Sequence, residues 1–343
     1  MSKEASLQDN TAHHFDVVAI GNAIVDVLSK SDEGFLLTNK INKGTMTLIE
    51  ADQAEALYEK MGPATEMSGG SAANTIAAIA SFGGRAGYIG KVAKDQLGSV
   101  FRHDMRAMGV SFDTPALDSG APTARCLILI TPDAQRTMCT FLGACVWISP
   151  TDLNEEMIRN AKVTYLEGYL FDRQRAKQAF KQAGDIAKAA GRKTALTLSD
   201  PFCVERHRDE FLDLIENNID IVFANEAEIT ALYHTRELDK AIYHIRQHCE
   251  IAAITLGEKG SVIVTRDSVI EIPPAKVDKV VDTTGAGDLY AAGFLYGYTH
   301  GMSLERCGEL GSIAAAEIIG HVGARPQTNL SDLMRAQLVQ KTA

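Results

Sequence analysis

Short runs of apolar, largely β-branched residues alternate with stretches of helical spacing along most of this 343-residue chain. These runs are rich in β-branched residues and lack a regular apolar–polar alternation, which is typical of strands covered on both faces. The predicted strands are 16–21, 86–92, 162–168, 193–199, 220–225 and 251–257. The predicted helices are 71–82, 95–108, 173–190, 205–216, 238–249, 286–300 and 304–319. This alternation predicts an α/β fold with a doubly wound, mostly parallel sheet and helices on both faces.

Two regions, about 30–50 and 111–142, break the alternation. Segments such as ARCLILIT and RTMCTFLG follow one another there without an obvious helix between them. We interpret both regions as a small β-sheet lid inserted into the α/β body. No repeat and no long Pro/Gly/Ser-rich linker divides the chain, so a single domain over 1–343 is expected.

Composition narrows the classes of function. The formal net charge is −10, which argues against a nucleic-acid partner held by phosphate neutralisation. The six cysteines are widely separated and form no C-x-x-C pair, so we expect reduced thiols and neither disulfides nor a zinc site. The first fifteen residues have no apolar core typical of a signal peptide, and no apolar stretch has the length of a membrane span. A cytoplasmic protein without a membrane partner is the expectation.

The segment VVDTTGAGDLYAAGF combines an apolar run, two glycines and the start of a small-residue helix near Ala286. Gly285 and Gly287 let the backbone approach a ligand, and free N–H groups at a helix N-terminus attract anions. Asp288 falls in the first turn, where it could accept the proton of an attacking hydroxyl. The segment therefore predicts an anion cradle next to a general base.

An ordinary glycine-rich turn is the alternative interpretation of GAGD taken alone. Two other nucleotide-binding patterns can be rejected. The Walker pattern fails because Arg85 stands where its first glycine is required and Val92 replaces its Ser/Thr. The dinucleotide fingerprint fails because Tyr290 occupies its third glycine position.

Two separated segments together resemble the ribokinase-like (PfkB) family of sugar and nucleoside kinases. One is DTTGAGD at 282–288, and the other is GGSAANTIAAIASFGG, which begins with the pair Gly69 and Gly70, with Gly98 further on. The resemblance extends from about residue 15 to 326. It implies a ribokinase-like fold and transfer of the γ-phosphoryl group of ATP to a hydroxyl of a small acceptor. Asp288 would then be the catalytic base, and Gly285, Ala286 and Gly287 the anion hole.

The resemblance also assigns the acceptor site. In the family the glycine pair and the following Asn bind acceptor hydroxyls, which corresponds to Gly69, Gly70 and Asn74 here. GNAIVD, which the pattern places at the end of the first strand, matches the family segment whose Asp binds two neighbouring hydroxyls. Asp26 is its counterpart, with Asn22 as a second contact. A helix start with small packing residues is the alternative for the glycine segment.

Further segments resemble the family's nucleotide site. NEAE contains Asn225 and Glu228 in the positions of an N-x-x-E motif that organises Mg²⁺ and its waters, although Asn225 would also cap a helix. TLGEKGSVIV resembles a nucleotide-binding turn, although a hairpin would read identically. K⁺ is a candidate further cofactor, and a monomer and a homodimer both remain open. The ATP-contact candidates are Asn225, Thr255, Gly257, Gly260, Asp282 and Thr283.

Within the family, GNAIVD, PTARCLILI and LSDPF lean toward the adenosine-kinase branch. The positions of that branch's base pocket correspond to Cys126, Tyr169 and Phe202, although such residues are also ordinary packing. Asp200, where the branch commonly has Ala, and the small pocket side chain of Leu170 depart from its pattern. Arg136 resembles a lid Arg that reaches the active site, with a solvated Arg as the alternative.

We therefore expect an ATP- and Mg²⁺-dependent kinase acting on the primary hydroxyl of a nucleoside, with adenosine the leading acceptor. The alternatives are inosine or guanosine as the nucleoside, a sugar kinase of the ribokinase, fructokinase or 2-keto-3-deoxygluconate kinase type, and a nucleoside-binding protein of the same fold that has lost catalysis.

Overall fold

The computed structural model describes residues 14–133 and 135–341, and over this range the strands form one eight-stranded and one five-stranded sheet. The larger sheet has the order β13-β12-β11-β10-β9-β8-β1-β5. Strands β5 to β11 of this order run parallel, whereas β12 and β13 are antiparallel at one edge. The strands are β1 (Phe15–Ile20), β5 (Ala86–Ile89), β8 (Ala161–Glu167), β9 (Lys193–Thr197), β10 (Ile221–Asn225), β11 (Ile251–Thr255), β12 (Ser261–Thr265) and β13 (Val269–Ile272). The predicted doubly wound α/β sheet is confirmed.

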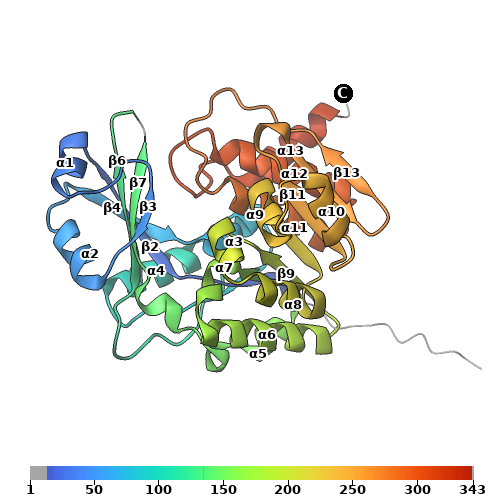
Figure 1. The fold of residues 1–343 in the computed structure, drawn as a ribbon, viewed down its shortest axis with the longest axis horizontal. Helices are drawn as coiled ribbons and strands as arrows, with labels where there is room; N and C mark the ends of the chain where they lie inside the picture. The colour runs from blue at the N-terminus through green and yellow to red at the C-terminus, as the bar shows by residue number, and fades with distance from the viewer. Residues whose placement is uncertain (1–13, 134, 342–343) are drawn as a thin grey trace, which may run out of the picture.

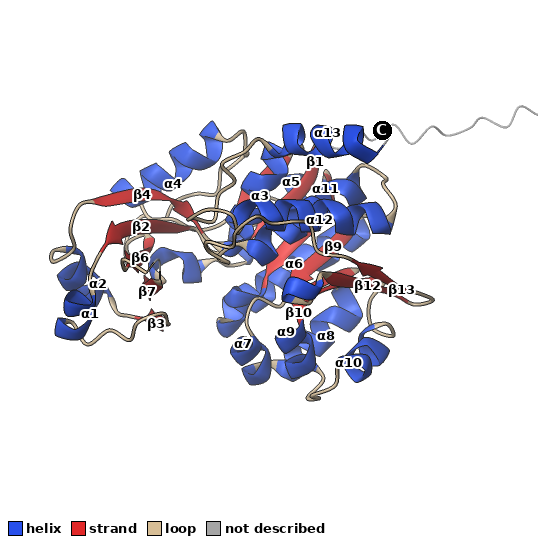
Figure 2. Ribbon diagram, turned by 90° about the horizontal axis from the view of Figure 1, so that it is seen from above, coloured by secondary structure: helices blue, strands red, loops and turns tan. Residues whose placement is uncertain are grey.

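Helices cover both faces of the large sheet (Figures 1 and 2). Neighbouring strand residues face opposite layers, as Val17 and Val18 of β1 show by belonging to two different apolar cores. One face carries α3 (Ser71–Ser81), α11 (Ala286–Thr299) and α12 (Leu304–Ile318), against which α13 (Leu330–Lys341) packs. The other face carries α5 (Glu155–Arg159), α6 (Gln174–Ala189), α8 (Arg208–Asn218), α9 (Glu226–Leu232) and α10 (Leu238–Ile245). Burial on both faces explains why these strands read as continuous apolar runs.

The five-stranded sheet is the lid, on the left of Figure 1, and its strand order is β3-β7-β6-β2-β4. Its strands are β2 (Ile24–Lys30), β3 (Met46–Leu48), β4 (Ala64–Gly69), β6 (Ala124–Ile130) and β7 (Arg136–Phe141). Helices α1 (Glu33–Thr38) and α2 (Ala51–Tyr58) connect the first three of them, and α4 (Gln96–Ala107) packs on β2 and β4.

The lid differs from its predicted extent. Its sheet begins at Ile24 and includes β4, well outside 30–50, whereas Ser111 belongs to the body through its bridge to Gly87. The predicted absence of helices near residues 30–50 is wrong. Helix α1 has a single buried residue, Leu36, so it leaves almost no apolar periodicity for a sequence pattern to reveal.

Helices α11 and α12 approach closely through glycine. A Cβ at Gly293 would overlap the Leu310 carbonyl group and lie 2.7 Å from the Gly311 nitrogen, and these backbone atoms cannot move aside. We expect Gly293→Ala to lower the free energy of unfolding by about 1–3 kcal/mol, the usual cost of overpacking. Denaturant titration measures this change.

Gly62→Ala is the matched control, because its added methyl group would meet nothing closer than the Ser29 hydroxyl at 3.7 Å. Equal stability of the Gly293→Ala variant and the wild-type protein would contradict the backbone contact between the two helices.

Candidate active site

The predicted site residues gather where the parallel strands of the body end and the lid begins. β1 leads into Asn22, β8 ends at Glu167, β10 ends at Asn225 and β11 ends at Thr255. Ligands of open α/β sheets bind at this carboxyl edge, because the loops there diverge to opposite faces of the sheet. Helices α3 and α11 also start at this edge, which brings their N-terminal N–H groups into the same region.

Asp288 lies in the first turn of α11, as predicted, and both of its carboxylate oxygens are hydrogen-bonded to α3. The Ser71 hydroxyl donates to Oδ1 at 2.6 Å, and the Asn74 amide donates to Oδ2 at 2.9 Å. Burial raises the pKa of Asp288, although these two donors and the nearby Arg325 guanidinium act in the opposite direction. A carboxylate with a raised pKa is a stronger base than an ordinary aspartate, which suits proton abstraction. Ser71 was not singled out in the sequence.

The glycine pair makes room for two acceptor-site residues. A Cβ on Gly69 would collide with the carboxylate of Asp26, which lies on the neighbouring strand β2 of the lid. A Cβ on Gly70 would collide with the backbone carbonyl of Asn22. Gly70 also has φ of 96°, a conformation that favours glycine. The structure thus places Asp26 inside a lid strand, not at the end of the first strand as its sequence position suggested.

Glu167 fixes the position of Asn22 and was missed in the sequence. Its Oε1 accepts from the Asn22 amide at 2.6 Å, and its Oε2 accepts from the backbone N–H groups of Ala72 at 2.9 Å and Asn22 at 3.3 Å. Burial raises the pKa of Glu167 to about 7 in spite of these donors. The signal that could have revealed it is its place at the carboxyl end of a buried strand.

Several hydrogen-bond acceptors in this region remain unused. Within the described residues, the buried amide oxygens of Asn22 and Asn74 have no hydrogen-bond partner. Burial also raises the pKa of Asp26 to about 6, against the opposing charges of Arg325 and Arg136. Buried polar atoms are normally paired, so unpaired acceptors of this kind indicate a hydroxyl-bearing ligand.

Arg325 is a second residue that the sequence did not reveal. Its guanidinium donates to the Ser68 carbonyl of β4 at 3.0 Å and to the Ala73 carbonyl of α3, and so joins lid to body. Burial lowers the pKa of Arg325 to about 10, while Asp26 and Asp288 hold it up, so the group stays cationic at neutral pH. It is a single Arg in the segment VGARPQ after the last core helix, where no periodicity marks it.

Arg136 crosses from the lid strand β7 to the body. Its Nε lies 3.1 Å from Oδ2 of Asp282, and both side chains are more than nine-tenths buried. The alternative of a solvated Arg is therefore wrong. Asp282 also accepts from Thr284 and from the backbone N–H of Gly323, so its carboxylate organises the loop before the cradle.

The predicted cradle segment forms the turn before α11 and the first residues of that helix. Gly285 has φ of 81° at the start of α11, and a Cβ on Gly287 would have no atom within 4 Å, so this face is open. The N–H of Ala286, however, already donates to the carbonyl of Thr283 at 3.2 Å, which leaves it less free for an anion than predicted.

Asn225 and Glu228 form a reciprocal capping box at the start of α9. The Asn225 amide donates to Glu228 Oε1 at 2.6 Å, and the Glu228 N–H donates to Asn225 Oδ1 at 2.9 Å. The capping interpretation of Asn225 is thus confirmed. Burial raises the pKa of Glu228 to about 7, with Asp200 and Asp288 adding to the rise. A divalent cation nearby would relieve this accumulation of negative charge.

The described residues contain no group of three or more His, Cys, Asp or Glu arranged to hold a metal. Asn225 and Glu228 carry oxygen atoms, which are the type of ligand that Mg²⁺ prefers. Thr255 ends β11 beside Asn225, and Gly257 and Gly260 form the predicted turn. A Cβ on Gly260 would collide with the carbonyl of Ile272, so this glycine has a packing role as well.

The predicted base-pocket residues have different environments. Cys126 is buried in the lid next to Asp26 and accepts from the Thr140 hydroxyl at 3.2 Å. Tyr169 and Phe202 are both exposed residues. Burial raises the pKa of the Tyr169 phenol, and the negative charges of Asp288 and Asp200 raise it further. Leu170 is buried in the apolar core instead, so its assignment as a pocket side chain is wrong.

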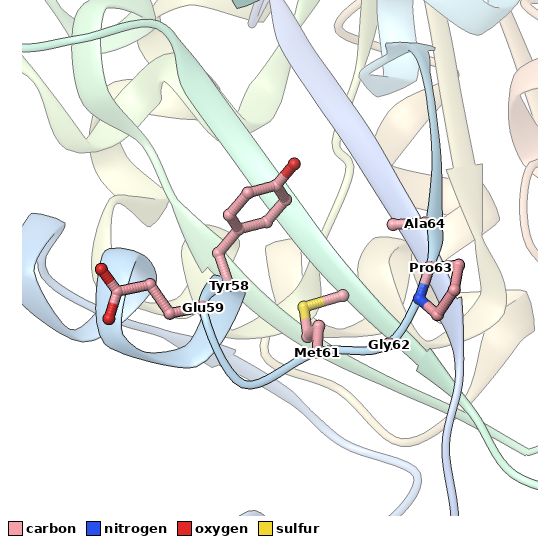
Figure 3. Close-up of a pocket in the computed structure, with 6 residues that line it drawn as sticks. All are labelled: Tyr58, Glu59, Met61, Gly62, Pro63 and Ala64. Carbon is pink, nitrogen blue, oxygen red and sulfur yellow. The ribbon is translucent and has the colours of Figure 1, made fainter.

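A separate hollow on the outside of the lid contains none of these residues (Figure 3). It lies at the turn between α2 and β4 and is lined by Tyr58, Glu59, Met61, Gly62, Pro63 and Ala64.

A comparison with known protein families agrees with the combination of a GAGD segment, its Asp288 and a glycine pair. The model of the pfkB family carbohydrate kinases matches residues 44–330. The chain belongs to this family. It is therefore a phosphotransferase that uses an alcohol group as acceptor, and the family implies ATP as the phosphoryl donor.

Individual relatives differ in their named substrates. An adenosine kinase structure from Sinorhizobium meliloti is 53% identical with a TM-score of 0.88, covering 94% of this chain and 99% of that one. A probable sugar kinase structure from Rhizobium etli is 49% identical with a TM-score of 0.88, covering 95% and 99%. A 5-dehydro-2-deoxygluconokinase from Halalkalibacterium halodurans is 27% identical over 90% of each chain.

Over the residues it describes, the structure has no helix with the length and hydropathy of a membrane span.

The contacts of Glu167 generate a prediction about acceptor binding. The Glu167 carboxylate accepts hydrogen bonds from N–H groups only. In Glu167→Gln, the amide NH₂ would face one of these donors, and that hydrogen bond would be lost. We expect kcat/KM for the acceptor to fall about tenfold or more, the scale of a lost charge-assisted hydrogen bond. The KM for ATP should stay unchanged in steady-state assays.

Glu59→Gln, at the exposed end of α2, serves as the control for a neutralised glutamate. Equal losses for acceptor and ATP in the Glu167→Gln variant would show a general structural role instead.

Proposed function

We propose that this protein phosphorylates the primary hydroxyl of a nucleoside, with adenosine the leading acceptor. The observation that carries the proposal is the position of two exposed aromatic residues at the carboxyl edge of the sheet. Tyr169 follows the end of β8 at Glu167, and Phe202 follows the neighbouring strand β9. A planar ring attached to a polyol would cover both aromatic faces, whereas a free sugar would leave them in water. The identity to the S. meliloti structure, which bears the name adenosine kinase, supports this acceptor.

The acceptor's sugar would be held from both the lid and the body. The Asp26 carboxylate accepts from two neighbouring hydroxyls, while Gly69 and Gly70 let the ring approach the backbone. The unpaired amide oxygens of Asn22 and Asn74 accept further hydroxyl protons. Because Asn74 also binds Asp288, the acceptor and the base are positioned by the same side chain.

In the transfer step, Asp288 removes the proton of the primary hydroxyl as its oxygen forms a bond to the γ-phosphorus of ATP. The bond to the bridging oxygen breaks in line, and ADP leaves. The N–H groups at the start of α11, mainly those of Gly285 and Gly287, stabilise the charge of the transferring group together with the helix dipole. Arg136, buried and without a hydrogen-bond partner on Nη2, adds positive charge from the lid.

The nucleotide would lie along the loop 282–287 and the turn between β11 and β12. Thr283, whose side chain is exposed next to the cradle, is a phosphate contact, while Asp282 holds the loop in shape. When it is bound with ATP, Mg²⁺ neutralises phosphate charge, and Asn225 and Glu228 would orient its waters. Thr255, Gly257 and Gly260 would border the nucleotide on its other side.

The test is ADP release from Mg-ATP with a panel of acceptors: adenosine, inosine, guanosine, ribose, fructose, 2-keto-3-deoxygluconate and 5-dehydro-2-deoxygluconate. We expect kcat/KM for adenosine to exceed that for any free sugar by at least about fivefold, since an aromatic stacking contact is worth about 1 kcal/mol or more. Addition of K⁺ tests the monovalent cation in the same assay.

Turnover of a free sugar alone would instead favour the sugar-kinase alternative that the R. etli and H. halodurans relatives represent. Nucleoside binding without ADP release would favour the non-catalytic alternative.

Asp288→Asn tests the assignment of the base. The amide keeps the size of the side chain but cannot take up the hydroxyl proton, so we expect kcat to fall by at least about a hundredfold. Asp278→Asn, in the exposed part of the preceding loop, is the matched control and should retain full turnover. An Asp288→Asn variant with turnover near that of the wild-type protein would refute the assignment.

A further inference from the structure

The two exposed aromatic rings are carried by two short helices that follow neighbouring strands. Tyr169 lies in the 3₁₀ helix η3 (Gly168–Asp172), directly after β8, and Phe202 lies in α7 (Pro201–Arg206), shortly after β9. The exposed fractions of these two residues, 42% and 68%, are high for aromatic residues. Neither ring is held by the core, so its position depends on the element that carries it.

The far ends of η3 and α7 are joined through Asp172. Its carboxylate accepts from Nη2 of Arg206, which lies 3.0 Å from both oxygens, and from Nε at 3.3 Å. Nε2 of His207 lies 2.8 Å from the same carboxylate. Burial alone would raise the pKa of Asp172, but the hydrogen bonds from His207 and Arg206 outweigh it and hold this pKa below its usual value. The last residue of η3 is therefore bonded to the residues at the end of α7.

η3 is anchored firmly in the body. Leu170 is buried in the core, and the Phe171 ring stacks on Phe211 of α8 with centroids 4.0 Å apart. The Lys177 ammonium lies 5.3 Å from the centre of the Phe171 ring and also pairs with Glu210. Because η3 is fixed in the core, a contact with η3 can fix the position of α7.

α7 packs against α9, but a smaller share of its own residues is buried than in η3. Only Cys203 and Val204 of its six residues are buried. It is preceded by a tight turn in which the Asp200 N–H donates to the Leu198 carbonyl at 2.8 Å, with Ser199 at φ of 67°. Such a three-residue turn is strained in a residue other than glycine. The Cys203 thiol reaches the Gly168 carbonyl at 3.6 Å near the other end, which leaves Asp172 as the charged connection to η3.

We propose that Asp172 is a positioning residue for the acceptor's base: it holds α7 against η3 so that Phe202 and Tyr169 form the two walls of one slot. This inference rests on the proposed nucleoside function. The slot takes a flat, apolar-faced ring such as a purine, and Asp172 itself touches neither the base nor the sugar.

The expected effect is on acceptor binding rather than on stability. Asp172 and Arg206 are both about half exposed, and exposed ion pairs contribute little to folding. Bidentate pairing nevertheless fixes geometry, and a displacement of about 1 Å in a positioning group can cost up to about a hundredfold in activity.

The experiment compares Asp172→Asn with the wild-type protein in steady-state kinetics and thermal unfolding. We expect KM for adenosine to rise about fivefold to twentyfold, because the Phe202 wall is misplaced. The kcat, the KM for ATP and the melting temperature should all change little, since Asp288 and the cradle are untouched. Asp172→Glu keeps the carboxylate and should restore most of the affinity.

Glu155→Gln is the matched control, because Glu155 forms a similarly exposed pair with Arg159 on another helix of the same face. It should leave the KM for adenosine unchanged. An unchanged KM for adenosine in Asp172→Asn, or an equal loss in KM for ATP and in kcat, would overturn the positioning role. Absence of nucleoside turnover by the wild-type protein would overturn the proposed function itself, which separates the two failures.

Discussion

The pair of hydrogen bonds from Ser71 and Asn74 to the Asp288 carboxylate connects the two halves of the catalytic region. The donors start one helix, and the acceptor starts another helix far along the chain. Because both helices begin at the carboxyl edge of the sheet, the proposed base and the proposed acceptor-binding segment are fixed relative to each other in the free protein. The glycine pair, Asn22 and Glu167 all depend on the position of α3, so this contact determines the geometry of the rest.

Charge is distributed unevenly around this contact. Asp26, Glu167, Glu228 and Asp288 are carboxyl groups whose pKa values burial raises, and the neighbouring cations are Arg325 and Arg136. Such crowding is costly in the free protein, and a ligand that brings hydroxyl donors or positive charge would relieve it. The energetic cost of the free site is thus part of what makes it selective for ligands that bring donors and positive charge.

Sequence patterns predicted the body well because its strands are buried on both faces and its helices have clear periodicity. The position of Asp288 in the first turn of a helix could be predicted because helix-terminus chemistry is a local property, whereas Gly69, Gly70 and Asn74 were proposed from the family resemblance. Sequence patterns could not reveal Glu167 or Arg325, since a single buried ionisable residue has no periodicity and its partners lie far away in the chain. For the same reason, the pairing of Arg136 with Asp282 was visible only in the structure, and the lid helices were missed because so few of their residues are buried.

The way in which the lid is attached has a consequence for how it can move. In the described residues the chain passes between lid and body after β1, before α3, before β6 and after β7. Because the lid is attached to the body by several chain crossings, it cannot slide or twist freely. The motion that these crossings allow is rotation about the line that joins them. Gly70 and Asn22 lie in two of them, so the rotation axis passes beside the acceptor site itself. Movement of the lid therefore changes the acceptor's binding geometry directly, with no intervening element to transmit it.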